Sequence, residues 1–419
     1  MNFIDKAVSA AGDALDKYKR DSQYPQPLCQ LIVDGQDITH AIEKRLISIN
    51  LTDNRGMEAD ALDISLSDHD GALAIPPRGA RIDLWLGWTT SGLVYKGSYT
   101  VDETEHSGAP DVLSIRARSA DLRETLKTKR EQTWKDVTLR EILSTIALRS
   151  QLDLKIAPSL SGQTIAHLDQ ANESDANIIT RLAEQFDAVI GVKAGCLICG
   201  VTGAGKTSSG LSLPHITLTR EDGDGHRFLQ ADRNSYCGVK AYYYEQNSAV
   251  KKEAIAGGGD NLKELRHTYA DQQSALRAAR SELSRLLRGT ATLSYQLAHG
   301  RPDLIPELTY SLIGVKDEID AITWLGSKVT HAYSSSGYTT SLELENQLPE
   351  LDDITELADL ANDYTGVVAY YKDKNGRQQK MEKGDQAKPK HLAHLYASMH
   401  SAKKAVDREQ ERLSKKTEP

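Results

Sequence analysis

The chain has 419 residues, of which 39% are hydrophobic and 26% are charged, as is typical of a soluble globular protein with several domains. Its formal net charge of -8 argues against nucleic-acid binding, which requires a basic face that displaces counterions from phosphates. No stretch approaches the run of about 18 apolar residues that a membrane-spanning helix requires, so membrane insertion is not expected.

The N-terminal segment, residues 1–22, is predicted to form an amphipathic helix. Its apolar residues recur at helical spacing and fall on one stripe: Ile4, Val8, Ala11, Leu15 and Tyr18. Charged residues interrupt the segment, so it lacks the continuous apolar core of a signal peptide, and we expect synthesis in the cytoplasm. The stripe suits either a docking or oligomerising helix, or a helix that covers the neighbouring domain.

Residues 23–120 are predicted to form a first β unit. Apolar and polar residues alternate in runs such as 62–67 and 81–86, which is the pattern of half-buried strands. Turn signals such as Asp34-Gly35 and Asp70-Gly71 separate these runs by short distances. We therefore expect consecutive antiparallel strands that form a small barrel or sandwich.

Residues 121–205 are predicted to form a helical α+β domain. Thr138 and Glu141 have the spacing of a capping box, and Ser174 is a plausible cap for a second helix. The apolar run from Cys196 to Cys199 resembles a strand. Period-two alternation then returns in 206–235 and 290–348, which predicts a second β unit with an insertion.

The insertion belongs to an internal repeat. Residues 236–244 recur at 364–372 with identities at 236, 238, 239, 241, 242 and 243, and residues 265–286 recur at 392–413. Each copy is predicted to contain a strand, a polar connection, a second extended piece and a helix capped by Asp271 or Ser398. The sequence thus predicts a duplicated β-β-α module at 236–289 and 350–419. Overall, the fold class is α+β with predominantly antiparallel β structure.

One motif suggests nucleotide chemistry: Gly200, Gly205, Lys206 and Thr207 satisfy the phosphate-binding pattern G-x-x-x-x-G-K-[ST]. Such a loop works through a helix that begins at the lysine and presents backbone N–H groups to the phosphates. Gly210 and Pro214 instead fall where that helix would run, and both disfavour a helix interior. We interpret the motif as a Gly/Ser-rich hairpin loop that mimics a Walker sequence.

Other chemical patterns are weak. Cys196 and Cys199 could belong to a zinc or redox site, but two further ligands are not evident, and buried structural thiols are favoured. Glu103 and Glu105 alternate with Val101 and Thr104 and suit a solvated strand face rather than a carboxylate pair for hydrolysis. His267 and His394 occupy equivalent points of the repeat and are interpreted as packing or capping residues. No catalytic residue, metal or cofactor is therefore predicted.

Tyr242, Tyr243 and Tyr244 form a run that could line a sugar-binding groove. Adjacent strand residues point in opposite directions, however, so packing combined with surface exposure is the favoured interpretation.

Several segments, in this order, resemble the phage late control protein D family, the tail hub proteins of contractile phages. The resemblance spans about residues 25–346. The segments that carry it are Gly35–Thr39, Arg45–Ile49, Leu62–Leu66, Ile75–Gly79, Gly97–Asp102, Ile115–Arg118, Glu173–Asp175, Arg181–Ala183, Ile216–Leu218, Gly300–Asp303, Ser336–Thr340 and Leu342–Glu345.

The resemblance implies two tube-like β-barrels with an intervening domain, similar to the base domain of the VgrG spike. It implies a homotrimer that presents six barrels and joins a six-fold tail tube to a three-fold spike in the virion baseplate. The implied partners are the tail spike protein, the tail tube protein, other baseplate proteins and the tape measure protein. The N-terminal helix and the second module copy lie outside this pattern.

Two alternatives stay open at this point. One is a P-loop nucleotide hydrolase built on residues 200–207, in which Lys206 binds phosphate and Thr207 binds magnesium. The other is a cell-wall-binding module that uses the tyrosine-rich repeats.

Overall fold

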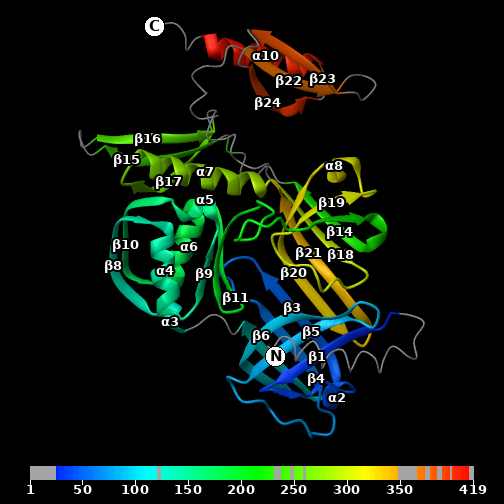
Figure 1. Cartoon of the computed structure of the whole chain (residues 1–419). Helices are drawn as coiled ribbons and strands as arrows, with labels where there is room; N and C mark the ends of the chain where they lie inside the picture. The colour runs from blue at the N-terminus through cyan, green and yellow to red at the C-terminus, as the bar shows by residue number, and fades with distance from the viewer. Residues whose placement is uncertain are drawn as a thin grey trace. The chain divides into compact units, whose positions relative to one another are not determined.

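The computed structural model describes residues 25–119, 124–230, 236, 238–245, 250–257, 261–347, 366–372, 378–384, 389–396 and 399–414. The chain divides into two compact units, Met1–Leu348 and Pro349–Pro419, and each is considered by itself (Figure 1). The helix predicted for residues 1–22 lies outside the described residues.

The first β unit follows the predicted alternation, because the apolar residues of each strand face one core. Its elements are β1 (Pro27–Val33), β2 (Gln36–Asp37), α2 (Thr39–Ile42), β3 (Leu46–Asn54), β4 (Ala61–Ser67), β5 (Arg81–Trp88), β6 (Gly92–Ser107) and β7 (Val112–Ser119). The strands lie in the order β3-β4-β7-β6-β5-β1 and are antiparallel. Leu31, Ile49, Leu62 and Leu84 are buried in the core.

The second β unit has its own core, around Leu293, Tyr310, Trp324 and Leu342. Its elements are β13 (His215–Thr219), η1 (Arg220–Asp222), β14 (Gly223–Gln230), β18 (Ala291–Leu297), β19 (Thr309–Ile313), α8 (Asp317–Asp320), β20 (Trp324–Ser334) and β21 (Gly337–Asn346). The strands lie in the order β14-β18-β21-β20-β19-β13.

The two β units share one strand order. When the strands are matched in chain order, β3, β4, β5, β6 and β7 correspond to β14, β18, β19, β20 and β21, and every pair between matched neighbours is antiparallel. The sixth strands, β1 and β13, occupy the same flank, although β13 runs parallel to β19 whereas β1 runs antiparallel to β5. The fold therefore repeats one arrangement twice.

The units are also fused, which the sequence did not predict. β20 of the second unit pairs with β3 of the first, from Lys328 opposite Asn54 to Ser334 opposite Ser48. The described strands of both units thus belong to one 13-stranded sheet, visible in Figure 1 where β20 meets β3.

The middle region has a core of its own and more β structure than expected. Its elements are α3 (Glu124–Lys127), β8 (Lys129–Thr138), α4 (Leu139–Arg149), β9 (Asp153–Ile156), α5 (Pro158–Ser161), β10 (Thr164–Ser174), α6 (Asp175–Phe186), β11 (Ala188–Lys193) and β12 (Cys196–Val201). The capping box of Thr138 with Glu141 is confirmed, and the Ser174 side chain accepts a hydrogen bond from the backbone N–H of Asn177. The paired strands β8 and β10 were missed because their sequences are rich in charged and polar residues.

The repeated module contains three strands rather than two, so the predicted β-β-α order was wrong. The first copy comprises β15 (Gly238–Glu245), β16 (Val250–Gly257), β17 (Leu262–Tyr269) and α7 (Gln272–Arg288). The second comprises β22 (Gly366–Lys372), β23 (Gln378–Gly384), β24 (Pro389–Tyr396) and α10 (Met399–Ser414). The expected polar connection is a strand in both copies, paired antiparallel to the first strand.

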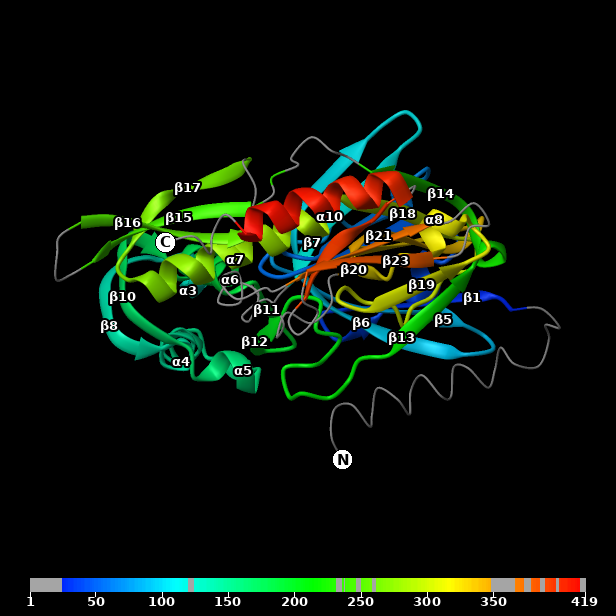
Figure 2. The same cartoon turned by 90° about the horizontal axis from the view of Figure 1, so that it is seen from above.

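In the first copy, the Asp271 side chain caps α7 by accepting from the backbone N–H of Ser274 at 2.8 Å, as predicted. Ser398 lies outside the described residues. α7 also packs against α6 of the middle region (Figures 1 and 2). Among the helices that the structure describes, none is both long enough and apolar enough to span a membrane.

Candidate functional site

The Walker-like residues form a hairpin-like loop after β12. Lys206 pairs with Ser212 in an antiparallel bridge, and the backbone N–H of Thr207 donates to the carbonyl of Leu211 at 2.7 Å. Residues 202–214, all described, contain no helix. Lys206 is therefore not at the N-terminus of a helix, which is where a P-loop gathers the N–H groups that hold phosphate.

The same loop is attached to the second β unit. The backbone N–H of Gly203 donates to Glu307 Oε2 at 2.9 Å, and Gln347 Nε2 donates to the carbonyl of Gly203 at 2.9 Å. The loop thus connects the end of β12 to two residues that flank the strands of the second core. Gly203 therefore anchors this loop to the second β unit.

The described cysteines are free thiols in protected positions. Cys199 is buried, and its burial raises the pKa of the thiol to about 12. Burial likewise raises the pKa of Cys29 to about 11. Because the thiolate is the reactive form, neither residue is suited to nucleophilic chemistry at neutral pH. Cys196 is half-buried, and Cys237 lies outside the described residues.

The remaining chemical candidates do not assemble into a reaction centre. The described residues contain no group of three or more His, Cys, Asp or Glu side chains placed to hold a metal ion. Tyr243 is buried whereas Tyr244 is 54% exposed, so the tyrosine run does not form a single wall. His267 is exposed rather than packed, and nothing is described of the His394 side chain.

Glu103 and Glu105 lie on the solvated face of β6, as their alternation predicted. Both approach one guanidinium: Arg116 Nη1 lies 2.6 Å from Glu103 Oε1, and Arg116 Nη2 lies 3.7 Å from Glu105 Oε2. Asp63 Oδ1 lies 3.9 Å from Arg116 Nε. Three carboxylates therefore surround one cation, which leaves the outer face of β6 with a surplus of negative charge.

Several buried or half-buried polar contacts lie where the two β units meet. The indole N–H of Trp88 on β5 donates to the carbonyl of Gly300 at 2.7 Å, and its ring stacks on His299 with centroids 3.7 Å apart. A Cβ at Gly300 would lie 2.5 Å from the ring of Tyr338, so this close approach requires glycine. Lys96 Nζ on β6 donates to the carbonyl of Pro302 at 3.1 Å. Residues 299–302, which follow β18, are therefore held against the first β unit.

An ion-pair network extends this joint to the other parts of the first compact unit. Arg55, which follows β3, lies 2.6 Å from Glu307 Oε1 and 2.5 Å from Glu345 Oε1, both in the second β unit. Arg288 at the end of α7 donates to Asp187 Oδ2 at 2.8 Å. Burial raises the pKa of Glu307, although Arg55 opposes the shift. The network links the two β units, the middle region and the inserted module.

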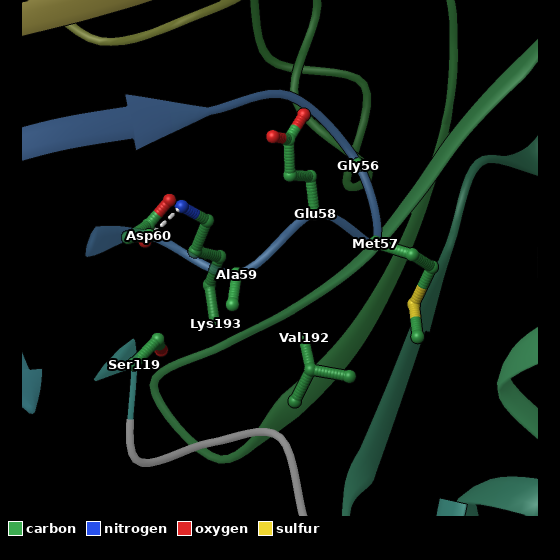
Figure 3. A pocket seen from close by; sticks show the side chains of 8 residues that line it. All are labelled: Gly56, Met57, Glu58, Ala59, Asp60, Ser119, Val192 and Lys193. Atoms are coloured by element: carbon green, nitrogen blue, oxygen red, sulfur yellow. Dashed lines mark hydrogen bonds and ion pairs between the residues drawn. The ribbon is translucent and has the colours of Figure 1, made fainter. Parts of the chain in front are cut away.

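A second charged cluster lies where the turn after β3 meets β11 (Figure 3). Lys193 Nζ donates to Asp53 Oδ1 at 2.9 Å and also contacts Asp60. Burial opposes the charged form of Lys193, but Asp53 and Asp60 outweigh it and raise the pKa of the amine. Burial and the neighbouring Asp53 raise the pKa of Asp60. The adjoining pocket has a volume of about 10 Å³, room for roughly one water molecule.

Sequence reasoning missed these joint residues. Each contact joins residues far apart in the chain, and no local motif marks them: Trp88 with Gly300, Lys96 with Pro302, and Arg55 with Glu307. Together they join the two β units through ring stacking, hydrogen bonds and ion pairs.

Comparisons with known proteins give a consistent result. Residues 58–337 match the family model described as "Phage tail baseplate hub (GPD)". The chain is 44% identical over 367 residues to the probable baseplate hub protein of Escherichia phage 186, covering 78% of this chain and 94% of that protein. It is 43% identical over 370 residues to the probable baseplate hub protein of Escherichia phage P2, covering 79% of this chain and 96% of that protein.

Among solved structures, the fold is similar to the tail protein from Neisseria meningitidis MC58. The TM-score is 0.58 at 14% sequence identity, and the match covers 77% of this chain and 97% of that one.

Proposed function

The chain belongs to the phage tail baseplate hub family, and on that premise we propose that it forms a homotrimeric ring that joins the tail tube to the central spike. Each chain contributes two β units to the ring, so that three chains present six. Six equivalent units match a six-fold tube on one face of the ring, and three chains match a three-fold spike on the other.

The observation that carries this proposal is the repeated strand order of the two β units. Five matched strands with the same antiparallel neighbours give the chain two copies of one arrangement. The fusion through β3 and β20 then provides a direct way to place such copies side by side. A ring of alternating first and second units is the closed assembly that this duplication favours.

The Trp88 contacts and the Arg55 network support a structural rather than an enzymatic role. They hold the two units at a fixed angle, which a ring of defined symmetry requires. The loop 200–207 acts as a connector to Glu307 and Gln347, and neither cofactor nor metal is needed.

The parts of the chain have separate tasks in this proposal. The two β units are the tube-like barrels of the ring, with boundaries at 23–120 and at 206–235 with 290–348. The middle domain, 121–205, and the inserted module, 236–289, support the outer side of these barrels. The partners are the spike, the tail tube, other baseplate proteins and the tape measure protein, and assembly follows synthesis in the bacterial cytoplasm.

The test is the size and symmetry of the purified protein. Light scattering is expected to give the mass of three chains, and electron microscopy a ring with three-fold or pseudo-six-fold symmetry. A stable monomer that does not bind its spike protein would contradict the proposal. Calorimetry with ATP distinguishes the hydrolase alternative, because the hub predicts no binding heat for the wild type or for Lys206→Ala.

A further inference from the structure

The joint inside the chain shows how one β unit can be added to another. β20 has two halves on the edge that faces away from β21. Its first residues, Trp324 and Leu325, pair with β19 of the same unit, whereas Lys328 to Ser334 pair with β3 of the other unit. A register shift between Gly326 and Lys328 separates the two halves.

β6, the strand matched to β20, has the same two halves. Residues Gly92 to Thr100 pair with β5 of the same unit. A register shift between Val101 and Glu103 follows, at nearly the same distance from the hairpin end as in β20. Among the strands that the structure describes, none pairs with residues 102–107 on this edge. β6 therefore presents the edge that β20 uses, without the strand that β20 receives.

β14, the strand matched to β3, is the complementary edge. It pairs with β18 along Gly223 to Gln230, and no other described strand pairs with it. An unpaired edge carries a row of backbone donors and acceptors that can receive another strand. β14 lies at one end of the 13-stranded path, on the far side of the fused strands from β6.

The side chains of the two edges are matched in charge. In the existing joint, the buried faces of the paired strands are continuous, since Leu51 lies opposite His331 and Ile49 opposite Tyr333. The same geometry places the outer face of β14 beside the outer face of β6. The outer face of β14 carries the exposed Arg227 and the half-exposed Leu229, opposite Ser294 and Thr292 of β18.

The outer face of β6 carries Glu103 and Glu105, within the excess of carboxylates around Arg116. Matching the hairpin ends of β6 and β20 sets Arg227 opposite Glu105 or, one pair of residues further, opposite Glu103. Opposite charges that face each other across an antiparallel pair are stabilising.

We infer that β14 of one chain pairs antiparallel with residues 102–107 of β6 in the next chain, with Arg227 facing Glu103 and Glu105. The occupant of each edge is a second copy of this chain. The contact is head to tail, so it forms a ring when the rotation closes. This inference rests on the proposed function and adds the surface that closes the trimer: three joints within chains alternate with three between them.

Charge reversal tests the pairing in the full-length chain. Arg227→Glu is expected to weaken the trimer by about tenfold or more in its dissociation constant, because like charges then face each other. Adding Glu103→Arg and Glu105→Arg to Arg227→Glu is expected to restore the trimer. Lys135→Glu, a reversal at an exposed position of β8, is the matched control and is expected to leave the trimer intact. Circular dichroism establishes that each variant is folded.

Cysteine pairs test the geometry independently. Arg227→Cys combined with Glu105→Cys, or with Glu103→Cys, is expected to give a disulfide between chains and a covalent trimer on a non-reducing gel. Neither single cysteine variant is expected to do so.

The outcomes separate the inference from the proposed function. A wild-type trimer that resists Arg227→Glu and yields no crosslink with either partner would overturn the β14–β6 pairing while the hub ring stands. A wild-type protein that is monomeric by light scattering would overturn both.

Discussion

The two copies of the repeated module have the same fold but differ in sequence along part of their helices. Both contain a central strand flanked by one antiparallel and one parallel neighbour, with a helix across the sheet. Their small helix residues coincide: Ala275 and Ala279 of α7 are buried, as are the aligned Ala402 and Val406 of α10. The two copies have therefore kept these positions buried between helix and sheet, with alanine replaced by valine at one of them.

The residues of α7 that contact α6 in the first copy are different in the second copy. In the first copy, the Ser281 hydroxyl donates to the carbonyl of Glu184 on α6, and the Arg277 guanidinium lies 4.6 Å from the ring of Phe186. Arg288 completes this docking face through Asp187. At the offset of the repeat, Ser281 is replaced by Arg408 and Arg277 by Lys404. The comparison teaches that the two copies share their buried helix positions but not the side chains that bind α6 in the first copy.

The largest expected effect comes from giving the first copy the residue of the second. Ser281 is 6% exposed, so Ser281→Arg forces a long charged side chain into the contact with α6. We expect a loss of about 4 kcal/mol in the free energy of unfolding, from overpacking and a buried charge without a designed partner. Urea denaturation measures the loss, and hydrogen exchange should show it on β15–β17 and α7.

The matched control is the reverse change, Arg408→Ser, in the second copy. The change lies outside α7, the helix that packs on α6, and is expected to alter stability by less than about 0.5 kcal/mol. Equal losses in the two variants would contradict a specific role of Ser281 in the contact between α7 and α6.

Arg288→Ala is expected to have the next largest effect. Burial penalises the charged arginine, but its hydrogen bonds to Asp187 outweigh this and raise the pKa of the guanidinium. Removing it leaves the Asp187 and Glu345 carboxylates without this partner, at a cost of about 3 kcal/mol. Thermal unfolding measures the cost. Arg288→Lys keeps the charge but not the bidentate hydrogen bonds to Asp187, so it should recover part of the lost stability. If it recovers none, the packing of the arginine and not its charge stabilises this contact.

The module also shows what could be predicted from the sequence. Its existence followed from aligned identities, and the Asp271 cap followed from local chemistry. The strand β16 did not, because Lys251, Lys252 and Glu253 make an exposed edge strand look like a polar connection. Alternation predicted the buried strands of both β units for the opposite reason: one face of each must be apolar.

The contacts that join the two β units could not be predicted from the sequence. Pairing of β3 with β20 depends on backbone groups, which every residue carries, so no side-chain pattern in the sequence indicates it. Arg55 and Glu307 are more than two hundred residues apart and become partners only after both units have folded. The same applies to Trp88 and Gly300.

A destabilising substitution in the second copy is expected to affect the stability of that copy only. Val406 is 1% exposed and packs with Val367 and Ala369, so Val406→Ala creates a cavity and is expected to cost about 2 kcal/mol. Hydrogen exchange of β22–β24 and α10 is the measurement, with Lys403→Ala, at an exposed position of α10, as the control. A comparable loss of protection in residues 25–347 would show that the two compact units unfold together.

The smallest expected effect concerns the helix cap of the first copy, which has Asp271 where the second copy has Ser398. Asp271 accepts from the Ser274 backbone N–H, and Asp271→Ala leaves that group without its cap, at a cost of about 1 kcal/mol. The aligned residue of the second copy is Ser398, and serine caps helices about as well as aspartate. Asp271→Ser should therefore remain within a few tenths of a kcal/mol of the wild type in urea denaturation. If Asp271→Ser proved as damaging as Asp271→Ala, the Asp271 carboxylate would be needed for more than the helix cap.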